Sequence, residues 1–262
     1  MCGIHLHRDV ITPSDIDIYN MQETDIPNAD CYAEYDAHRN AGRKLAFGKS
    51  TQLAKDGSSF GRRVAISSRT AEMYDLKIDG DDLHVLELSG RWIEKLIPVG
   101  NGDRFVINAI FCGIAGASSD SEKARENERL LATALSRMLQ FKDTPYFLAM
   151  DGNISPSCSK TISAATNEGL VHDLPRDWAQ DADNVQCTFF RDKIIEQDKT
   201  GKGITRIDTI LANHPASQLV EDVNYGWTQS KGFDHLMIIA LIDLDVINMK
   251  SLQLKKNKTC RS

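Results

Sequence analysis

Short runs of apolar residues, each closed by a polar or turn-forming residue, are the feature that most limits what this chain can fold into. The most apolar run, residues 236–242, reads Leu-Met-Ile-Ile-Ala-Leu-Ile and stops at Asp243. Its length is about a third of a membrane span, which is typical of a buried strand. Comparable runs lie at 16–21, 62–68, 83–88, 92–97, 105–111, 146–150, 185–190 and 207–212. The pattern therefore predicts a protein built mainly from β-strands.

One segment departs from the strand pattern. Ser119-Asp-Ser-Glu122 has the spacing of a capping box. The apolar residues after it recur at helical spacing: Leu131, Ala134, Leu135, Met138 and Leu139. We therefore expect a helix over 120–141. Asn101-Gly102 predicts a hairpin between the two strands that flank it. Strands around one long helix predict an α/β or α+β domain over residues 1–248, followed by a basic, flexible tail over 249–262.

The charge balance limits the kind of partner. The chain has 31 Lys and Arg against 37 Asp and Glu, a formal net charge of −6. This excludes coating of nucleic acid by bulk positive charge, although a local basic rim with a metal ion stays compatible. The six cysteines include no C-x-x-C pair, which favours reduced thiols. With no signal peptide and no membrane span, we expect an intracellular protein, nuclear or cytoplasmic, with a monomer favoured.

Polar side chains follow or interrupt four of the predicted strands. An acidic group inside or against an apolar strand is costly unless it is paired or bound to a metal. Each such residue alone is also common in turns, at strand ends and in ion pairs, so the set matters more than any member. Hard oxygen donors without a cysteine pattern favour Mg²⁺ or Mn²⁺ over Zn²⁺. The residues are Glu23, Asp151, Asn153, Asp208, Asp234 and His235.

These positions resemble a known family. The segments Met21-Gln-Glu-Thr24, Met150-Asp-Gly-Asn153, Arg206-Ile-Asp-Thr-Ile-Leu211 and Phe233-Asp-His235 resemble, in order, the Gln-Glu, Gly-Asp-x-Asn, Arg-Ile-Asp and Ser-Asp-His signatures of the endonuclease/exonuclease/phosphatase superfamily. Cys187-Thr-Phe-Phe190 and Arg62-Arg-Val-Ala-Ile66 are similar to two of its strands. The resemblance implies the DNase I-like fold, a four-layer sandwich of two packed mixed β-sheets flanked by helices. It also implies metal-dependent cleavage of a phosphoester.

The resemblance further implies roles at the metal and at the attacking water. Glu23 would bind Mg²⁺ or Mn²⁺, with Asp234 assisting on the metal side. Asp151 would orient or deprotonate the water, and Asn153 would hold the nucleophile or the phosphate. Such an arrangement supplies both a base and positive charge where negative charge grows in the transition state.

The remaining roles concern the phosphate. By the same resemblance, His235 would stabilise charge on the phosphoryl oxygens, and Asp208 would fix its tautomer and raise its pKa. The segment 42–63 is rich in Lys and Arg. We interpret Arg62 and Arg63 at its end as substrate-binding residues, with a solvated loop as the alternative interpretation.

The chain departs from the family pattern at several places. The family's first strand carries an Asn, and only 22 residues precede Glu23 here, with no Asn at a matching place. Met150 replaces the Gly of one signature, and Phe233 replaces the Ser of another. The strand 105–111 continues into Cys112, where many relatives have a Tyr or His that contacts phosphate. One interpretation is that the first strand is missing and activity is impaired.

The most specific hypothesis is a DNA endonuclease that nicks its substrate. The chain resembles the endonuclease portions of non-LTR retrotransposons and apurinic/apyrimidinic endonucleases. Two alternatives stay open: a phosphoinositide or phospholipid phosphatase of the same superfamily, and a catalytically inactive relative that serves as a binding module.

Overall fold

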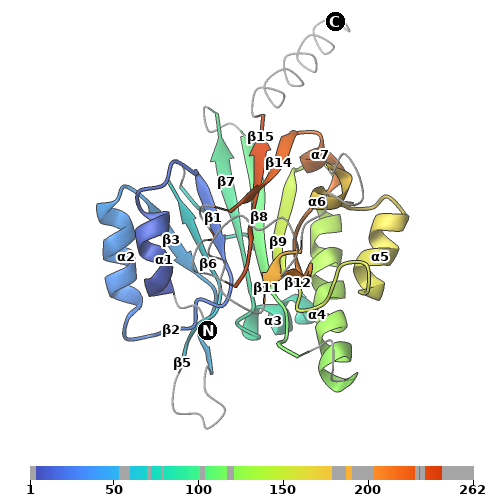
Figure 1. Cartoon of the computed structure of the whole chain (residues 1–262), viewed down its shortest axis with the longest axis horizontal. Helices are drawn as coiled ribbons and strands as arrows, with labels where there is room; N and C mark the ends of the chain where they lie inside the picture. Colours follow the sequence, from blue (N-terminus) through green and yellow to red (C-terminus); the bar gives the residue numbers. More distant parts are fainter. Residues whose placement is uncertain are drawn as a thin grey trace, which may run out of the picture.

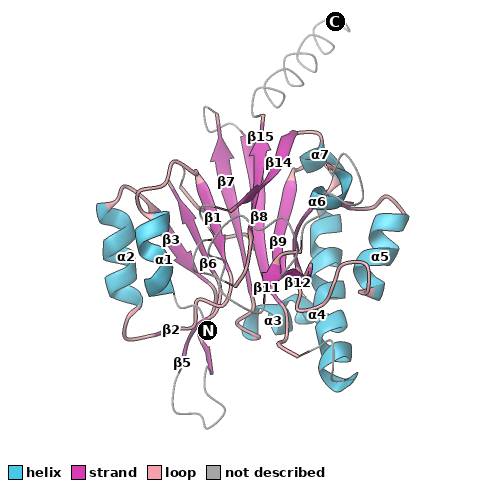
Figure 2. Ribbon diagram, viewed as in Figure 1, coloured by secondary structure: helices cyan, strands magenta, loops and turns pink. Residues whose placement is uncertain are grey.

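Two layers of β-sheet pack face to face, with helices on their outer sides (Figures 1 and 2). The computed structural model describes residues 4–52, 60–69, 72–77, 80–100, 104–116, 121–178, 187–190, 203–227, 230 and 234–243. The inner core between the layers joins side chains from both sheets: Val64, Ile66, Ile93, Ile110 and Cys112. This arrangement confirms the expected α/β sandwich.

The larger sheet has five strands in the order β10-β13-β9-β8-β7. Their bounds are β7 Trp92–Val99, β8 Arg104–Cys112, β9 Tyr146–Asp151, β10 His172–Asp173 and β13 Asp208–Ala212. The pair β8–β9 is parallel and the other pairs are antiparallel, so the sheet is mixed. Every residue of β9 is buried, as expected for a central strand covered on both faces.

The second layer is divided among shorter sheets. A three-stranded sheet has the order β1-β6-β3, with β1 Ile18–Met21, β3 Lys44–Phe47 and β6 Ala65–Ser68. A separate pair joins β14 Val220–Gly226 to β15 Met237–Ile242. Two smaller sheets hold β2 Ile26–Pro27, β4 Thr51–Gln52 and β5 Phe60–Arg62, and β11 Phe189–Phe190 with β12 Gly203–Thr205.

Helices cover the two outer faces. On one side lie α1 Ile4–Ile11 and α2 Cys31–Asn40, beside the three-stranded sheet (Figure 1). On the other side lie α3 Asp81–Leu88, α4 Ser121–Gln140 and α5 Lys160–Asn167, which bury apolar residues on the five-stranded sheet. The short helices α6 Leu174–Asp177 and α7 His214–Ser217 follow β10 and β13. None of the helices in the described ranges has the length and apolarity that a membrane crossing needs.

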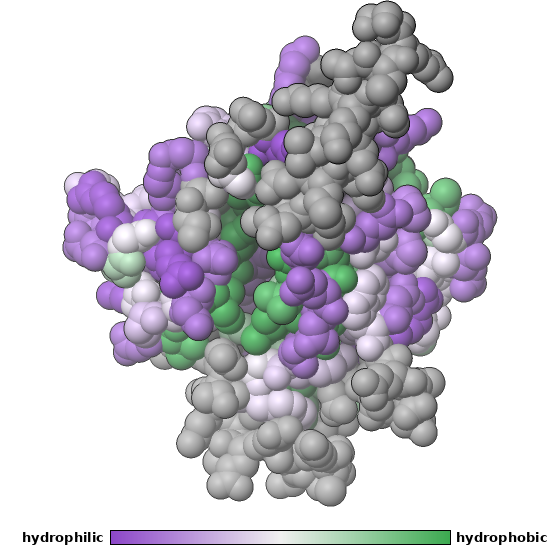
Figure 3. Space-filling model, turned by 90° about the horizontal axis from the view of Figure 1, so that it is seen from above, coloured by the Kyte–Doolittle hydropathy of each residue, from purple (hydrophilic) through white to green (hydrophobic). Residues whose placement is uncertain are grey.

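One helix and one strand precede Glu23 within the described residues. Within the described residues, the element that precedes β1 is the helix α1, and β1 pairs with β6 alone. The strand β15 is only partly covered, and Leu241 is 56 % exposed. Seen from above, apolar residues lie in the middle of the surface between hydrophilic rims (Figure 3).

Most of the expected elements are present. The strands at 16–21, 92–97, 105–111, 146–150 and 207–212 and the helix at 120–141 are confirmed, with shifted ends. The hairpin is confirmed by the antiparallel pair β7–β8, although its turn residues lie outside the described part of the chain. The predicted tail over 249–262 also lies outside the described residues.

Two predicted strands are wrong, one in its type of secondary structure and the other in its continuity. Residues 83–88 form the helix α3, because Leu83 and Leu86 bury one face at i, i+3 spacing and Asp81 and Asp82 favour a helix N-terminus. The segment 62–68 is split between β5 and β6, which belong to different sheets.

Candidate active site

Three polar side chains lie in one row across the larger sheet. Cys112 at the end of β8 pairs with Asp151 at the end of β9, and Asp151 pairs with Asp208 at the start of β13. Residues directly opposite each other in neighbouring strands project from the same face of the sheet. The strand register therefore brings together residues that are distant in sequence.

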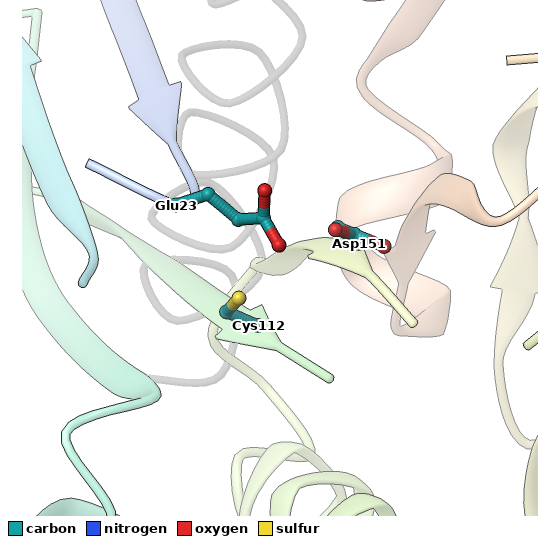
Figure 4. Close-up of side chains that lie close together, drawn as sticks. All are labelled: Glu23, Cys112 and Asp151. Carbon is teal, nitrogen blue, oxygen red and sulfur yellow. The ribbon is translucent and has the colours of Figure 1, made fainter. Parts of the chain in front are cut away.

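The other layer contributes Glu23. It follows β1 with φ +50°, a left-handed conformation that is uncommon for a residue with a side chain. The next residue fixes this turn, because the Thr24 amide donates to Arg63 O (3.0 Å) and its hydroxyl donates to Arg62 O (2.6 Å). Glu23 points toward the ends of β8 and β9 (Figure 4). One ligand atom from each of Glu23, Cys112 and Asp151 lies within 4.8 Å of the other two.

His235 completes a second group beside the first. Its Nδ1 lies 3.0 and 3.2 Å from the two carboxylate oxygens of Asp208. Ligand atoms of Asp151, Asp208 and His235 also lie within 4.8 Å of one another. Because Nδ1 faces a carboxylate, it carries a proton, and Nε2 is left for another partner. Asp151 therefore belongs to both groups.

The segment around β11 fixes the positions of His235 and Asp208. The Leu236 amide donates to Thr188 O (2.7 Å), and the Phe190 amide donates to Asp234 O (2.8 Å). The Thr188 hydroxyl is fully buried and accepts from the amides of Ile207 (3.1 Å) and Asp208 (2.9 Å). One threonine thus connects the start of β13 to the segment that carries His235.

The turn after β9 fixes Asp151. Asn153 has φ +49°, and its amide donates to Asp151 Oδ1 at 3.0 Å while its side-chain nitrogen lies 3.3 Å from Oδ2. Gly113 and Gly152 approach so closely that a Cβ on Gly113 would lie 2.3 Å from Gly152 O. The buried Asn127 of α4 bridges the two loops, accepting from the Ile114 amide (2.9 Å) and donating to Gly152 O (2.9 Å).

Burial and neighbouring charge set the protonation of Asp151. The side chain is only 2 % exposed. Burial is the largest cause that raises its pKa, the charges of Asp208 and Glu23 add to the rise, and His235 and the Asn153 amide oppose it, so that the pKa stands at about 7. A carboxylate with this pKa can exchange a proton near neutral pH.

The neighbours of Asp151 are shifted by similar causes. Burial lowers the pKa of His235, but the charge and hydrogen bond of Asp208 outweigh it, with Asp151 and Asp234 adding to the rise, and the pKa reaches about 10. Burial is the largest cause that raises the pKa of the Cys112 thiol, the charge of Asp151 adds to the rise and Arg91 opposes it, so that the pKa stands at about 12. At neutral pH the imidazole is therefore cationic and the thiol is protonated.

The structure brings together five of the residues singled out from the sequence. They are Glu23, Asp151, Asn153, Asp208 and His235. Within the described part of the chain, neither metal-capable group includes Asp234. Its carbonyl pairs with β11, and its charge contributes to the raised pKa of His235.

The predicted substrate-binding arginines lie near Glu23 but are engaged by protein atoms. Arg62 donates to Gly48 O (2.6 Å), and Arg63 donates to Asp25 (3.1 Å) and to Gln52 O (3.1 Å). Both are half-buried. Their backbone carbonyls hold the turn that follows Glu23, as described above.

Arg206 lies two residues before Asp208 in the sequence but pairs with Asp173. Arg206 binds the Asp173 carboxylate through both guanidinium nitrogens, at 2.6 and 2.8 Å. Sequence reasoning also left out Cys112, Asn127 and Thr188 as site residues. The available signal for Cys112 was its place at the end of a strand, but its neighbours follow only from the sheet register.

The donor set of the first group fits a divalent ion. Two donors on an ion with bonds of about 2.1 Å can lie at most about 4.2 Å apart. The Glu23 and Asp151 carboxylates meet near this limit, so small side-chain movements suffice. Their oxygens are donors that Mg²⁺ and Mn²⁺ prefer, whereas the Cys112 sulfur is not.

Comparisons with known proteins identify the architecture. A scan of protein-family models finds no match, and a search of curated proteins finds none either. Among solved structures, an AP endonuclease from Archaeoglobus fulgidus is 20% identical with a TM-score of 0.63, covering 92% of this chain and 96% of its own. The 3′ phosphatase NExo from Neisseria, bound to product DNA hairpin, is 17% identical with a TM-score of 0.68 and the same coverage.

A third structure, the human Nocturnin catalytic domain with a bound sulfate anion, is 13% identical with a TM-score of 0.56, covering 91% of this chain and 86% of its own. Together these likenesses show that the chain has the DNase I-like fold of endonuclease/exonuclease/phosphatase proteins. This confirms the fold that the four sequence signatures implied.

Proposed function

We propose that the chain is a divalent-metal-dependent phosphodiesterase that nicks DNA, as an endonuclease of the retrotransposon type. The observation that carries the proposal is the shared position of Asp151. It lies between a metal-capable group with Glu23 on one side and the Asp208–His235 pair on the other. A phosphate between the two groups would meet positive charge from both directions, with a buried carboxylate next to it.

The residues divide the work of hydrolysis between them. A divalent ion, Mg²⁺ or Mn²⁺, held by Glu23 with Asp151 beside it would supply positive charge next to the phosphoryl oxygens. Asp151 accepts the proton of the attacking water, a role that a pKa of about 7 suits. His235 donates from Nε2 to a phosphoryl oxygen, because Asp208 holds its other ring nitrogen.

Two further residues support this arrangement in the proposal. The backbone amide of Asn153 donates to the Asp151 carboxylate and fixes it. The side chain of Asn153 is proposed to hold the nucleophile or the phosphate. Asp234 assists by its negative charge, which contributes to the cationic form of His235. The positions of both residues near the reacting groups support these roles.

Nucleic acid is the proposed substrate. One structure with this fold carries a product DNA hairpin, and Arg62 and Arg63, at the end of the basic segment 42–63 of this chain, contact the Glu23 turn. Both arginines are proposed to contact DNA phosphates. The described thiols at Cys31, Cys112, Cys158 and Cys187 are free, which supports the proposal that the chain acts inside the cell; we propose that it acts there as a monomer.

A plasmid-nicking assay tests the proposal. Supercoiled plasmid is incubated with the purified chain in Mg²⁺ or EDTA, beside Asp151→Asn and the matched control Asp143→Asn. Asp143 is exposed and lies just before β9, whereas Asp151 ends it. We expect nicking in Mg²⁺ by wild type and Asp143→Asn only.

The other outcomes separate the alternatives. Equal nicking by Asp151→Asn would contradict the assigned site and indicate a contaminating nuclease. If wild type does not nick plasmid but releases phosphate from a phosphoinositide, the substrate assignment is wrong and the phosphatase alternative is correct. If it does neither, the inactive binding module remains as the interpretation.

A further inference from the structure

We propose that Glu23, Cys112 and Asp151 together form a binding site for a thiophilic divalent ion of the Zn²⁺ class. Such an ion would compete with Mg²⁺ and block hydrolysis. The binding site follows from the geometry of the three side chains, whereas the inhibition rests on the proposed function.

The position of the sulfur is built into the fold. Cys112 is the last residue of β8, is 2 % exposed, and pairs with Asp151 in the parallel register of β8 and β9. The Arg91 guanidinium donates to the carbonyl oxygens of Cys112 and Gly113, and its Nη1 lies 3.9 Å from the sulfur. The end of the strand is therefore held firmly, and the sulfur lies where the two sheets meet.

Two of the donors end the neighbouring strands β8 and β9, the third follows β1, and all three converge. In Figure 4 the Cys112 sulfur and the Glu23 carboxylate lie on the same side of the strand ends, with Asp151 beside them. The three ligand atoms lie within 4.8 Å of one another. Two carboxylates and one thiolate would offset the charge of a divalent ion, and Arg91 adds positive charge near the sulfur.

The chemistry of the sulfur separates the ions that can use all three donors. Mg²⁺ prefers hard oxygen ligands in octahedral geometry, so the thiol takes up space beside it without binding. Zn²⁺ binds thiolate at about 2.3 Å and carboxylate at about 2.0–2.2 Å in tetrahedral geometry. Glu23, Cys112 and Asp151 would fill three positions and leave the fourth to water. On binding, the thiol proton is released to solvent and the sulfur forms the new metal bond.

This binding mode explains why the thiophilic ion would inhibit. Asp151 is the residue that we propose as the proton acceptor for water, and an ion bound through all three side chains would occupy its carboxylate. An ion that binds the sulfur would thus occupy the site at a concentration well below the concentration of Mg²⁺. Nicking supported by Mg²⁺ would then stop when trace Zn²⁺ is added and resume when a chelator selective for Zn²⁺ removes it.

Cobalt spectroscopy tests the site without any activity measurement. Co²⁺ replaces Zn²⁺ readily, and a thiolate bound to it gives a sulfur-to-cobalt charge-transfer band in the near ultraviolet. In the full chain we expect this band to saturate at one equivalent of Co²⁺ and to disappear on addition of Zn²⁺. Cys112→Ser should abolish the band, and Cys158→Ser, at an exposed thiol, should leave it unchanged. A band that persists in Cys112→Ser would overturn the proposal.

A second variant guards against misfolding of the serine variant. Glu23→Gln keeps the thiol but removes one ligand, so at least about tenfold more Co²⁺ should be needed for half of the band. An unchanged titration in Glu23→Gln would show that Glu23 does not bind the cobalt held by the sulfur and would overturn the proposal. Circular dichroism of both variants shows whether they are folded.

Nicking assays then separate the two proposals. Within each protein, the Zn²⁺ concentration that halves its own Mg²⁺-supported nicking should rise at least tenfold in Cys112→Ser. A cobalt band in a wild-type protein that does not nick would support the thiophilic site and contradict the nuclease function. Nicking by wild type without a cobalt band would support the nuclease and overturn the thiophilic site.

Discussion

The Nδ1 atom of His235 lies 3.0 Å from the Asp208 carboxylate, and this pair keeps the imidazole charged well above neutral pH. Asp208→Asn would remove the largest contribution that raises the pKa of His235. We expect that pKa to fall from about 10 toward the ordinary value of about 6.5. The nicking rate should fall at least about a hundredfold at pH 8, because the cation that stabilises the phosphoryl oxygens is lost.

NMR titration of the His235 ring protons measures the first effect, and plasmid nicking measures the second. Asp143→Asn, an exposed change in the same chain, should alter neither. A His235 that still titrates near pH 10 in Asp208→Asn would contradict the assigned pair.

Asp151 should make the nicking rate rise with pH, because it must lose its proton to act, whereas His235 must keep its proton. Its pKa of about 7 means that the carboxylate is protonated below pH 7 in the metal-free protein. We expect nicking at low Mg²⁺ to rise about tenfold per pH unit below pH 7 and to level off above it. Higher Mg²⁺ should move the midpoint to lower pH, because the ion competes with the proton. Rates measured from pH 5 to 9 at constant ionic strength test this, and a flat profile would contradict it.

The sequence predicts the site residues better than it predicts their arrangement. Glu23, Asp151 and His235 each adjoin an apolar run, and a run of that kind must be buried, so the polar residue at its end marks where a strand leaves the core. That local signal needs no knowledge of the partner strands. It located each residue that the two metal-capable groups contain, with the exception of Cys112.

The arrangement depends on contacts between distant parts of the chain. Cys112 and Asp208 become neighbours of Asp151 only through the order β8-β9-β13 and its register. Apolar periodicity over six residues also cannot separate a buried strand from a short helix. For this reason the strand that the sequence predicts over residues 83–88 is wrong. The helix forms there because one face packs on α4 and β7.

Asn127 should stabilise the loops of the site rather than take part in the reaction. Asn127→Ala would leave the Ile114 amide and the Gly152 carbonyl without their partner in a buried place. We expect a loss of about 2–4 kcal/mol in the free energy of unfolding, or a Tm lower by roughly 5–10 °C. Ser136→Ala, an exposed change on the same helix, should shift Tm by no more than about 1 °C. Equal shifts in thermal melts of the two variants would refute the bridging role.

Asp151 should destabilise the metal-free fold, and metal binding should relieve this. Its folded pKa of about 7 lies above the unfolded value of about 3.9, so the folded state holds the proton more tightly. The stability from this proton is fully present below about pH 4 and is lost as pH rises through 7, a loss of at most roughly 4 kcal/mol. At pH 8 without metal, Asp151→Asn should therefore unfold at a higher temperature than wild type, since the neutral amide avoids the buried charge.

Adding Mg²⁺ should narrow the difference in stability between the two proteins. An ion at a hundred times its Kd stabilises the folded wild type by about 2.7 kcal/mol, whereas Asp151→Asn has lost a charged neighbour of the ion and should gain little. Thermal melts at pH 8 with EDTA and with millimolar Mg²⁺ measure both differences, and Glu23→Gln should lose the Mg²⁺ response as well. If wild type is the more stable protein in EDTA, the burial of an ionised Asp151 is not costly, and the pKa that supports its role as proton acceptor is wrong.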